Sequence, residues 1–401
     1  MASLSRDARL VLAAQAARAF AYGFGAVLLG TTLHRRHLSG TEVGIVLAAI
    51  VAGGALMSIV LARSGDRIGR RRCYTALYFL LALTGVTFAL TDRVWVLVLV
   101  ALAGAFSTDV VDSGPFTSLE QAMLATEVSG RDRIRVFSIY NAVAGAGGAL
   151  GALAAGLPSL VRSVWADAPG DSTWFLIVVP VAAVGLLLGR SLSASVEVAP
   201  SSHTDSTGLA RSRPIVIRLA GLFALDSFGG GFVVQAFVAY WLVTRFGAST
   251  ETVAFVFFGV AMSQTISFLA AWKVAQRIGL LSTMVWTHLA SNALLILIAV
   301  APSLELAVAA LVGRTLLSQM DVPARQAYVM TLVDPSERTA AAAYTSTARY
   351  LSRPVGPALA GAASSVALGL PFVIAGVSKA IYDVVLWRWF SRVPLPDDQL
   401  S

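Results

Sequence analysis

Charged side chains that could exchange a proton or bind an anion lie inside apolar stretches of this sequence. In the stretch 94–124, Asp109, Asp112, Phe116 and Glu120 follow one another at spacings of three, four and four. These spacings predict a single helical face. A charged group inside a membrane is costly unless it is paired or hydrated, which makes it a functional candidate. We expect Asp109 and Asp112 to exchange protons, and an alternative role for Asp112 is to cap a helix break beside the next proline.

The stretch 304–332 repeats this pattern with basic residues. Arg314, Ser318, Asp321 and Arg325 are spaced by four, three and four, which again predicts one helical face. A guanidinium binds carboxylate or phosphate groups through paired hydrogen bonds. Arg314 is therefore a candidate to bind an anionic group of a small molecule. Asp321 is a candidate for the same site or for a helix cap beside the next proline.

An internal repeat relates these charges. An offset of 205 residues aligns the two stretches, and an offset of 208 aligns the segments 20–24 and 228–232. Three pairs of equivalent positions then carry opposite charges: Asp109 and Arg314, Glu120 and Arg325, and Arg18 and Asp226. Two roles compete for such pairs. They could form salt bridges between facing halves and gate a cavity, which we favour for Glu120 and Arg325, or they could bind a proton and an anionic ligand, which we favour for the other four.

Further polar residues extend this set. Gln15 and Tyr22 each lie about one helical turn from Arg18, so we expect them to line the same cavity. Arg349 and Arg353 lie one turn apart, and both are candidates for ligand contact. Neutralising a nearby aspartate or a helix end is the alternative for the second of them. His288 is interpreted as a peripheral packing histidine.

The elements that must position these groups are membrane-spanning helices. The chain of 401 residues is 57% hydrophobic and 13% charged, whereas soluble domains carry about 25% charged residues. About 20 apolar residues span a bilayer core. Twelve such segments are expected, at 10–32, 42–62, 73–91, 94–124, 135–160, 173–190, 215–243, 252–272, 280–300, 304–332, 338–366 and 369–390. The fourth and tenth are overlong and are expected to break at Pro115 and Pro323.

Charge and cysteine usage exclude several classes of protein. Arg and Lys concentrate in alternate loops, so the net charge of +8 follows the positive-inside rule with both termini cytoplasmic, and nucleic acid is not expected as a partner. Cys73 is the only cysteine, which excludes disulfides within the chain and cysteine-rich metal sites. No phosphate-binding loop is present, so ATP is not expected as the energy source, and no cofactor or metal is expected. No catalytic constellation is visible, and we do not expect an enzyme.

The polar, Ser/Pro-rich stretch 191–214 predicts a cytoplasmic linker between two six-helix bundles, 1–190 and 215–401. Between the second and third segments the chain reads Ala62-Arg-Ser-Gly65-Asp66-Arg67-Ile-Gly69-Arg70-Arg71-Arg72. This resembles the signature loop of the major facilitator superfamily, G-x-x-x-D-R-x-G-R-R-R, with alanine where that family usually has glycine. Ala275-Gln276-Arg277-Ile278-Gly279 is a degenerate copy in the second half.

The resemblance implies an all-α integral membrane protein of two pseudo-symmetric six-helix bundles, with helices one, four, seven and ten lining a central cavity. Asp66, Arg67, Gly69 and Arg70 are then expected to act in gating. The mixture of buried arginines and carboxylates favours an anionic or zwitterionic small molecule.

We expect a proton-coupled exporter in a bacterial-type cytoplasmic membrane, with Asp226 and Asp109 as the first candidates for the proton site, functional as a monomer in the lipid bilayer. A proton symporter that imports a nutrient is the alternative. A transport-inactive membrane sensor or scaffold is the rival from a different class.

Overall fold

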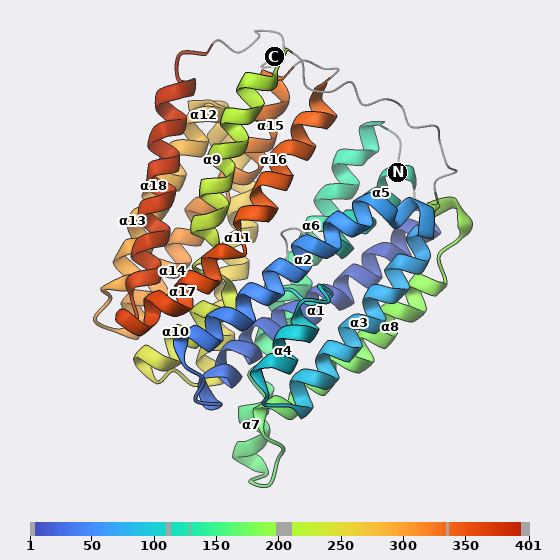
Figure 1. The fold of residues 1–401 in the computed structure, drawn as a ribbon, viewed down its shortest axis with the longest axis vertical. Coiled ribbons are helices and arrows are strands. Elements are labelled where there is room, and N and C mark those ends of the chain that lie inside the picture. Colours follow the sequence, from blue (N-terminus) through green and yellow to red (C-terminus); the bar gives the residue numbers. More distant parts are fainter. Residues whose placement is uncertain (1–4, 110–113, 128–129, 198–210, 334–336, 394–401) are drawn as a thin grey trace. The chain divides into compact units, whose positions relative to one another are not determined.

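The computed structural model describes residues 5–109, 114–127, 130–197, 211–333 and 337–393, and these residues form helices without any strand (Figure 1). The chain folds into two compact units. Unit 1 comprises Met1–Ser201 and Val234–Ala261, and unit 2 comprises Ser202–Val233 and Met262–Ser401. The boundaries expected from the sequence, 1–190, 191–214 and 215–401, remain a prediction, and residues 198–210 of the expected linker lie outside the described residues.

The helices of unit 1 are α1 (Arg6–Arg35), α2 (Gly40–Ile68), α3 (Arg70–Leu90), α4 (Val94–Ala101), α5 (Pro115–Glu127), α6 (Gly130–Ala154), α7 (Leu157–Val164), α8 (Val178–Arg190) and α10 (Gln235–Phe246), with 3-10 helices at Asp171–Ile177 and Ala194–Val196. The long helix α11 (Thr250–Ile278) contributes to both units. In unit 1, α1 packs along α6 and α3 packs along α8, as Figure 1 shows for the latter pair.

The helices of unit 2 are α9 (Arg213–Gly231), α12 (Leu280–Ser282), α13 (His288–Ala299), α14 (Leu304–Ser318), α15 (Asp321–Leu332), α16 (Arg338–Ser352), α17 (Val355–Val366) and α18 (Leu370–Phe390), with a π-helical turn at Thr283–Thr287. Here α9 packs against α16 and α18, and α13 lies beside α18 (Figure 1).

Nine stretches among the described residues are long and apolar enough to cross a membrane. The other three expected segments, 94–124, 304–332 and 338–366, are each divided into two shorter helices. The breaks have local causes. Gly104 has a positive φ of 74°, and Pro354 lacks the N–H that would continue a helix. The three divided segments carry most of the charged candidates, and irregular backbone at membrane depth occurs where protein or a hydrated cavity covers it.

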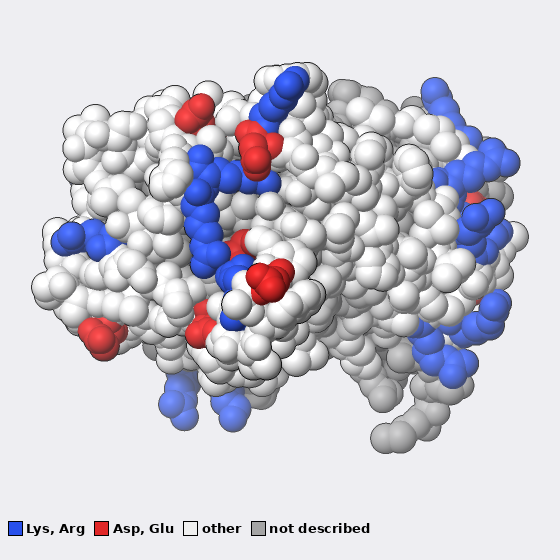
Figure 2. Space-filling model, turned by 90° about the horizontal axis from the view of Figure 1, so that it is seen from below, with Lys and Arg blue, Asp and Glu red and all other residues white. Residues whose placement is uncertain are grey.

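The surface fits an apolar surrounding. Large exposed hydrophobic side chains include Leu56, Phe79, Trp95, Phe255 and Leu269, exposed by 55 to 75%. Most of the surface visible in Figure 2 carries no charge, and Lys, Arg, Asp and Glu gather in a few places. Lipid chains can cover such a surface without the penalty that water would impose.

The repeat seen in the sequence is a repeat of helix crossings. In unit 1, the segment 20–24 of α1 crosses α6 at Gly151, where an added Cβ would overlap the backbone of that segment. In unit 2, the equivalent segment 228–232 of α9 crosses α17 at Gly356, whose Cβ would lie 2.6 Å from the Cα of Gly231. Gly151 and Gly356 are related by the offset of 205. Small residues at a crossing let two helix backbones approach closely. Arg18 and Asp226 each lie two residues before such a crossing, so the repeated segments hold both charges close to a neighbouring helix.

Candidate functional site

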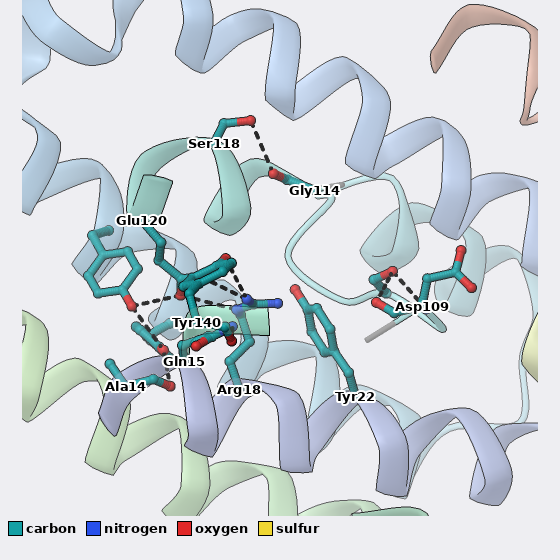
Figure 3. A network of polar contacts seen from close by, with 12 residues as sticks. Ala14, Gln15, Arg18, Tyr22, Asp109, Gly114, Ser118, Glu120 and Tyr140 are labelled. Atoms are coloured by element: carbon teal, nitrogen blue, oxygen red, sulfur yellow. Dashed lines mark hydrogen bonds and ion pairs between the residues drawn. The ribbon is translucent and has the colours of Figure 1, made fainter. Parts of the chain in front are cut away.

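The first charged cluster is an ion pair buried inside unit 1. Arg18 on α1 donates from Nε to Glu120 Oε1 (3.1 Å) and from Nη2 to Glu120 Oε2 (2.7 Å), as Figure 3 shows. The side chains are 2% and 0% exposed. Two parallel hydrogen bonds between guanidinium and carboxylate are the strongest form of this interaction. Arg18 and Glu120 therefore form a fixed pair between α1 and α5.

Tyrosines occupy the remaining hydrogen-bonding capacity of Glu120. Tyr74 on α3 donates to Oε1 (2.8 Å) and Tyr140 on α6 donates to Oε2 (2.7 Å). Tyr78, one turn beyond Tyr74, donates to the carbonyl oxygen of Ala14 on α1 (2.7 Å). Each carboxylate oxygen thus accepts from the arginine and from one tyrosine, which offsets the cost of burying the charge.

Aromatic rings enclose the guanidinium. The Cζ atom of Arg18 lies 5.1 Å from the centre of the Tyr22 ring and 5.6 Å from that of Phe116, within the range of cation–π attraction. Tyr22 donates to the carbonyl of Ala105 (2.7 Å). Gln15 donates from Nε2 to the carbonyl of Tyr140 (2.9 Å), and its buried Oε1 has no hydrogen-bond partner among the described residues. Gln15 and Tyr22 thus lie in the cluster around Arg18, and their role in lining a cavity remains a prediction.

Asp109 does not share the face that carries Glu120. The described residues between α4 and α5 are not helical, and the N–H of Asp109 donates to Ser107 Oγ (3.0 Å) in a local turn. The expectation of one continuous acidic helical face was wrong, because a positive φ at Gly104 interrupts the helix and Pro115 starts a new one. In the view of Figure 3, Tyr22 lies between Arg18 and Asp109. Asp112 lies outside the described residues.

The second charged cluster surrounds Asp226 on α9 in unit 2. Lys379 on α18 donates from Nζ to Asp226 Oδ1 (2.5 Å), and Arg325 on α15 donates from Nη1 to Oδ2 (3.2 Å). Arg325 also forms an ion pair with Asp321, one turn earlier on α15 (3.3 Å). The four side chains are 4 to 8% exposed. Lys379 is a member of the cluster that the sequence did not single out.

A histidine joins this cluster to a third carboxylate. His288 on α13 contacts Asp383 on α18 through Nδ1 (2.9 Å), and its Nε2 lies 3.7 Å from Asp226 Oδ1. Asn292 donates to Asp383 Oδ2 (2.8 Å). The interpretation of His288 as peripheral was wrong, because the residue is 4% exposed and lies between two carboxylates. Helical spacing could have found the group, since His288 and Asn292, and likewise Lys379 and Asp383, are four residues apart.

The other arginines of unit 2 lie on the divided helices. Arg314, near the end of α14, is half-buried, and its Nε has no hydrogen-bond partner among the described residues. Ser227 Oγ donates to the carbonyl of Arg349 (2.9 Å), and Arg353 lies at the break between α16 and α17. The break between α14 and α15 also interrupts the basic face expected from the sequence, although Asp321 and Arg325 still share one face of α15. Within the described ranges, no three His, Cys, Asp or Glu side chains are grouped to hold a metal ion.

Comparison with known proteins identifies the family. Residues 11–318 match the model of the Major Facilitator Superfamily. The chain belongs to the Major Facilitator Superfamily. It is a multi-pass membrane protein and, as a member of this superfamily, a transporter of a small molecule.

Individual relatives and solved structures agree with this. An uncharacterized membrane protein of Saccharomyces cerevisiae, YJR124C, is 24% identical, with 97% of this chain and 95% of that protein covered. The crystal structure of the nucleoside transporter NupG superposes with a TM-score of 0.74 at 16% identity, covering 96% of this chain and 98% of the other. That of a D-xylose-proton symporter gives 0.73 at 14% identity, covering 98% and 99%. The superfamily fold of two six-helix bundles, expected from the sequence, is thereby confirmed.

The signature loop of the superfamily forms a tight turn. Gly69 ends α2 with φ 101°, and Gly279 in the degenerate copy has φ 85°. The N–H groups of Arg70 and Arg71 donate to the Glu197 carboxylate (2.7 and 3.1 Å), which caps the start of α3. The Arg70 guanidinium donates to the carbonyl of Ala122 on α5 (3.2 Å).

Asp66 and Arg67 belong to the same loop. Arg67 is exposed, and the side chain of Asp66 lies outside the described residues. A gating role for this loop remains a prediction.

The internal repeat of the chain relates its two buried ion pairs to each other. Arg18 pairs with Glu120 inside unit 1, and the equivalent positions Asp226 and Arg325 pair inside unit 2. Each of these charges therefore has a partner within its own unit, whereas the sequence had suggested salt bridges between facing halves as one possible role. The order of the charges is inverted between the halves: the basic residue comes first in Arg18–Glu120, and the acidic residue comes first in Asp226–Arg325.

Proposed function

We propose that this transporter is a proton-coupled exporter of an anionic or zwitterionic small molecule, working by alternating access of the halves 1–190 and 215–401. The observation that carries the proposal is the position of Asp226, a buried carboxylate shared by two cations from different helices, Lys379 and Arg325. Such a cluster can exchange partners, because Asp226 already interacts with cations on two other helices.

A zwitterionic ligand can replace the internal partners without leaving a charge unpaired. Its anionic group would take the place of Asp226 beside Arg325 and Lys379, and its cationic group would take their place beside Asp226. Arg314, Arg349 and Arg353 are further candidates for the anionic end, and Asp321 completes the set. Arg18, Gln15 and Tyr22 lie in a cluster whose hydrogen bonds are largely satisfied, which favours a positioning role for them.

Proton coupling follows from competition at Asp226. A proton neutralises the carboxylate, so it weakens the attraction for the cationic group of the ligand. Proton and ligand then occupy Asp226 alternately, which is antiport, and an inward proton gradient drives the ligand out. Asp109 is the second candidate for the proton site, and Asp112 the third. For a purely anionic ligand the direction of proton movement relative to the ligand reverses. A neutral Asp226 would free Lys379 and Arg325 to bind the ligand, so proton and ligand would move together, which is symport.

That alternative, import with a proton, receives support from the similarity to a D-xylose-proton symporter. The sign of proton movement separates the two. In proteoliposomes containing a pH-sensitive dye, compounds added to one side should move protons in the opposite direction under antiport and in the same direction under symport. A screen of metabolites and drugs with this readout also finds the ligand.

The matched variants are Asp226→Asn and Asp92→Asn. Asp226→Asn should abolish ligand-dependent proton movement. Asp92, whose side chain is 83% exposed beside Arg36, is the control and should behave like the unmodified protein. Ligand movement that carries no proton in either direction would overturn proton coupling, and unchanged coupling in Asp226→Asn would overturn the assignment of this residue.

We assign gating to Glu120, Arg325 and the loop residues Asp66, Arg67, Gly69 and Arg70. Because Glu120 and Arg325 each pair inside their own half, opening and closing would require an exchange of partners. Glu120→Gln and Arg325→Gln should therefore change the rate at which a thiol reagent labels a cysteine placed near the cytoplasmic helix ends. Equal labelling rates in both variants and in the parent protein would contradict the gating role.

A further inference from the structure

His288 lies between the two carboxylates Asp226 and Asp383 in the interior of unit 2. Its Nδ1 contacts both oxygens of Asp383, at 2.9 and 3.1 Å, while its Nε2 lies 3.7 Å from Asp226 Oδ1. The Asp383 side chain is 0% exposed and also accepts a hydrogen bond from Asn292 (2.8 Å). The imidazole thus has one nitrogen in a tight contact and the other in a looser one.

The tight contact fixes the tautomer of a neutral His288. An ionised carboxylate only accepts hydrogen bonds, so the hydrogen of the ring must be on Nδ1, facing Asp383. Nε2 is then unprotonated and faces another acceptor, Asp226 Oδ1. The two acceptors are 3.7 Å apart, so a proton added to Nε2 would face Asp226 Oδ1, and the new N–H would donate to it once the two atoms approach to hydrogen-bond distance.

The surroundings of His288 contain other ionisable groups. The phenol ring of Tyr382 on α18 packs edge-on against His288, with the ring centres 5.8 Å apart. Arg349 on α16 and Arg314 on α14 also act on Asp226 electrostatically. Together with Asp321 and Arg325 on α15, Lys379 and Asp383 on α18, and Asp226 on α9, these groups set the field in which His288 titrates.

We infer that the proton that competes with the ligand at Asp226 is held beside the carboxylate, on Nε2 of His288, and not on the carboxylate itself, and that Asp383 and Asn292 orient the ring. This rests on the proposed function, because it names the group through which a proton competes with the ligand at Asp226. One proton from water binds Nε2 and forms an imidazolium. Its new N–H donates to Asp226 Oδ1 and displaces the cationic group of the ligand, and loss of the same proton to water on the other side restores the acceptor.

The protonation of His288 can be measured without any ligand. The chain has only four histidines, His34, His37, His203 and His288. Replacing the first three by glutamine leaves a protein with a single histidine in its native place, and ¹⁵N-imidazole NMR in nanodiscs then reports only on that ring.

We expect the neutral ring to carry its hydrogen on Nδ1 and the protonated ring to carry a second hydrogen on Nε2. The Nε2 signal of the protonated ring should differ in Asp226→Asn, because the carboxylate that faces this nitrogen is gone, and it should be the same in Asp92→Asn as in the parent protein. A neutral ring with its hydrogen on Nε2, a ring that never becomes an imidazolium in the folded protein, or an Nε2 signal that Asp226→Asn leaves unchanged would each overturn the assignment.

A transport measurement then tests the role in coupling. With the compound that gives the strongest dye signal in the liposome screen, His288→Asn should lose proton movement but retain exchange of labelled for unlabelled compound, which needs no net proton transfer. His34→Asn, on α1 in unit 1, is the matched control and should keep both.

The possible failures are distinguishable. If the parent protein moves the compound without protons, the proposed function fails. If the parent protein is coupled and His288→Asn is coupled to the same extent, only the role of His288 fails.

Discussion

Replacing Glu120 by glutamine should destabilise the protein strongly. The change removes the negative charge from a pair whose side chains are 2% and 0% exposed, and it leaves the Arg18 guanidinium buried without a counter-ion. Breaking a buried pair in this way costs about 3–5 kcal/mol. Glutamine also has one acceptor oxygen where the carboxylate had two, so one of the hydroxyls of Tyr74 and Tyr140 loses its acceptor, at about 1–3 kcal/mol.

A double variant separates the charge from the hydrogen bonds. In Arg18→Met/Glu120→Gln the unpaired charge is gone, and the methionine can pack against the Tyr22 and Phe116 rings that enclosed the guanidinium. The double variant should therefore be more stable than Glu120→Gln alone, because replacing both members of a buried pair is often close to neutral. A double variant that is more stable than Glu120→Gln would indicate that the pair stabilises the protein through charge balance.

The assay is reversible unfolding in mixed detergent micelles, with the free energy of unfolding obtained by titration with a denaturing detergent. Asp92→Asn serves as the control, since Asp92 is 83% exposed beside Arg36 and an exposed pair contributes at most about 1 kcal/mol. If Glu120→Gln lies within about 1 kcal/mol of the parent protein, or if the double variant is less stable than Glu120→Gln, charge balance is not what stabilises this pair.

Three further outcomes are expected. Gly356→Ala should lower the free energy of unfolding by about 1–3 kcal/mol, because its Cβ would lie 2.6 Å from Gly231 Cα, whereas Gly221→Ala, with nothing within 4 Å, should be neutral or stabilising. Glu337→Gln should speed amide hydrogen exchange in the first turn of α9 by several-fold, because the carboxylate accepts from the N–H groups of Arg211 and Ser212 (2.9 and 2.8 Å) and a charged cap contributes about 1 kcal/mol. With Cys73 replaced by alanine, a flexible bis-thiol reagent should join cysteines at His34 and Thr244, whose side chains form a hydrogen bond of 2.9 Å. If α1 and α10 move apart during the transport cycle, this cross-link should stop transport. Undiminished transport after complete cross-linking would show that the two helices do not move apart.

The spans, the signature loop and the repeat could be predicted because each depends on local sequence. Apolar length predicts a span, and the positive φ of Gly69 and Gly279 follows from a turn that only glycine adopts at low cost. The helix boundary at Pro115 was also predictable, since proline favours the first turn of a helix. The unwound residues after Ala101 were not, because the apolar run continues beyond that residue and the close packing of Gly104 against Gly53, where an added Cβ would not fit, is a tertiary feature.

The partners of the buried charges could not be read from spacing. Helical periodicity relates residues of one helix, so it joined Asp321 to Arg325 correctly and said nothing about Arg18 and Glu120, which are 102 residues apart. Lys379 and Asp383 are four residues apart on the last helix, and the same rule could have indicated a charged face there. Their contacts with Asp226 and His288 required the packing of α18 against α9 and α13.

Equivalent positions in the two halves carry opposite charges, and this is understandable only when both members of each ion pair are considered together. A buried charge can be exchanged for its opposite only if its partner changes too, so a duplicated unit must preserve Arg18–Glu120 or invert both positions together, as Asp226–Arg325 does. The surroundings then distinguish the two halves. Around Glu120 the hydrogen-bond donors among the described residues are tyrosines and the arginine, and these groups keep their protons near neutral pH. Around Asp226 the contacts include Lys379 and His288, and the second ring nitrogen of His288 faces the carboxylate and can accept a proton. We therefore infer that the pair in the second half is the one that responds to protons.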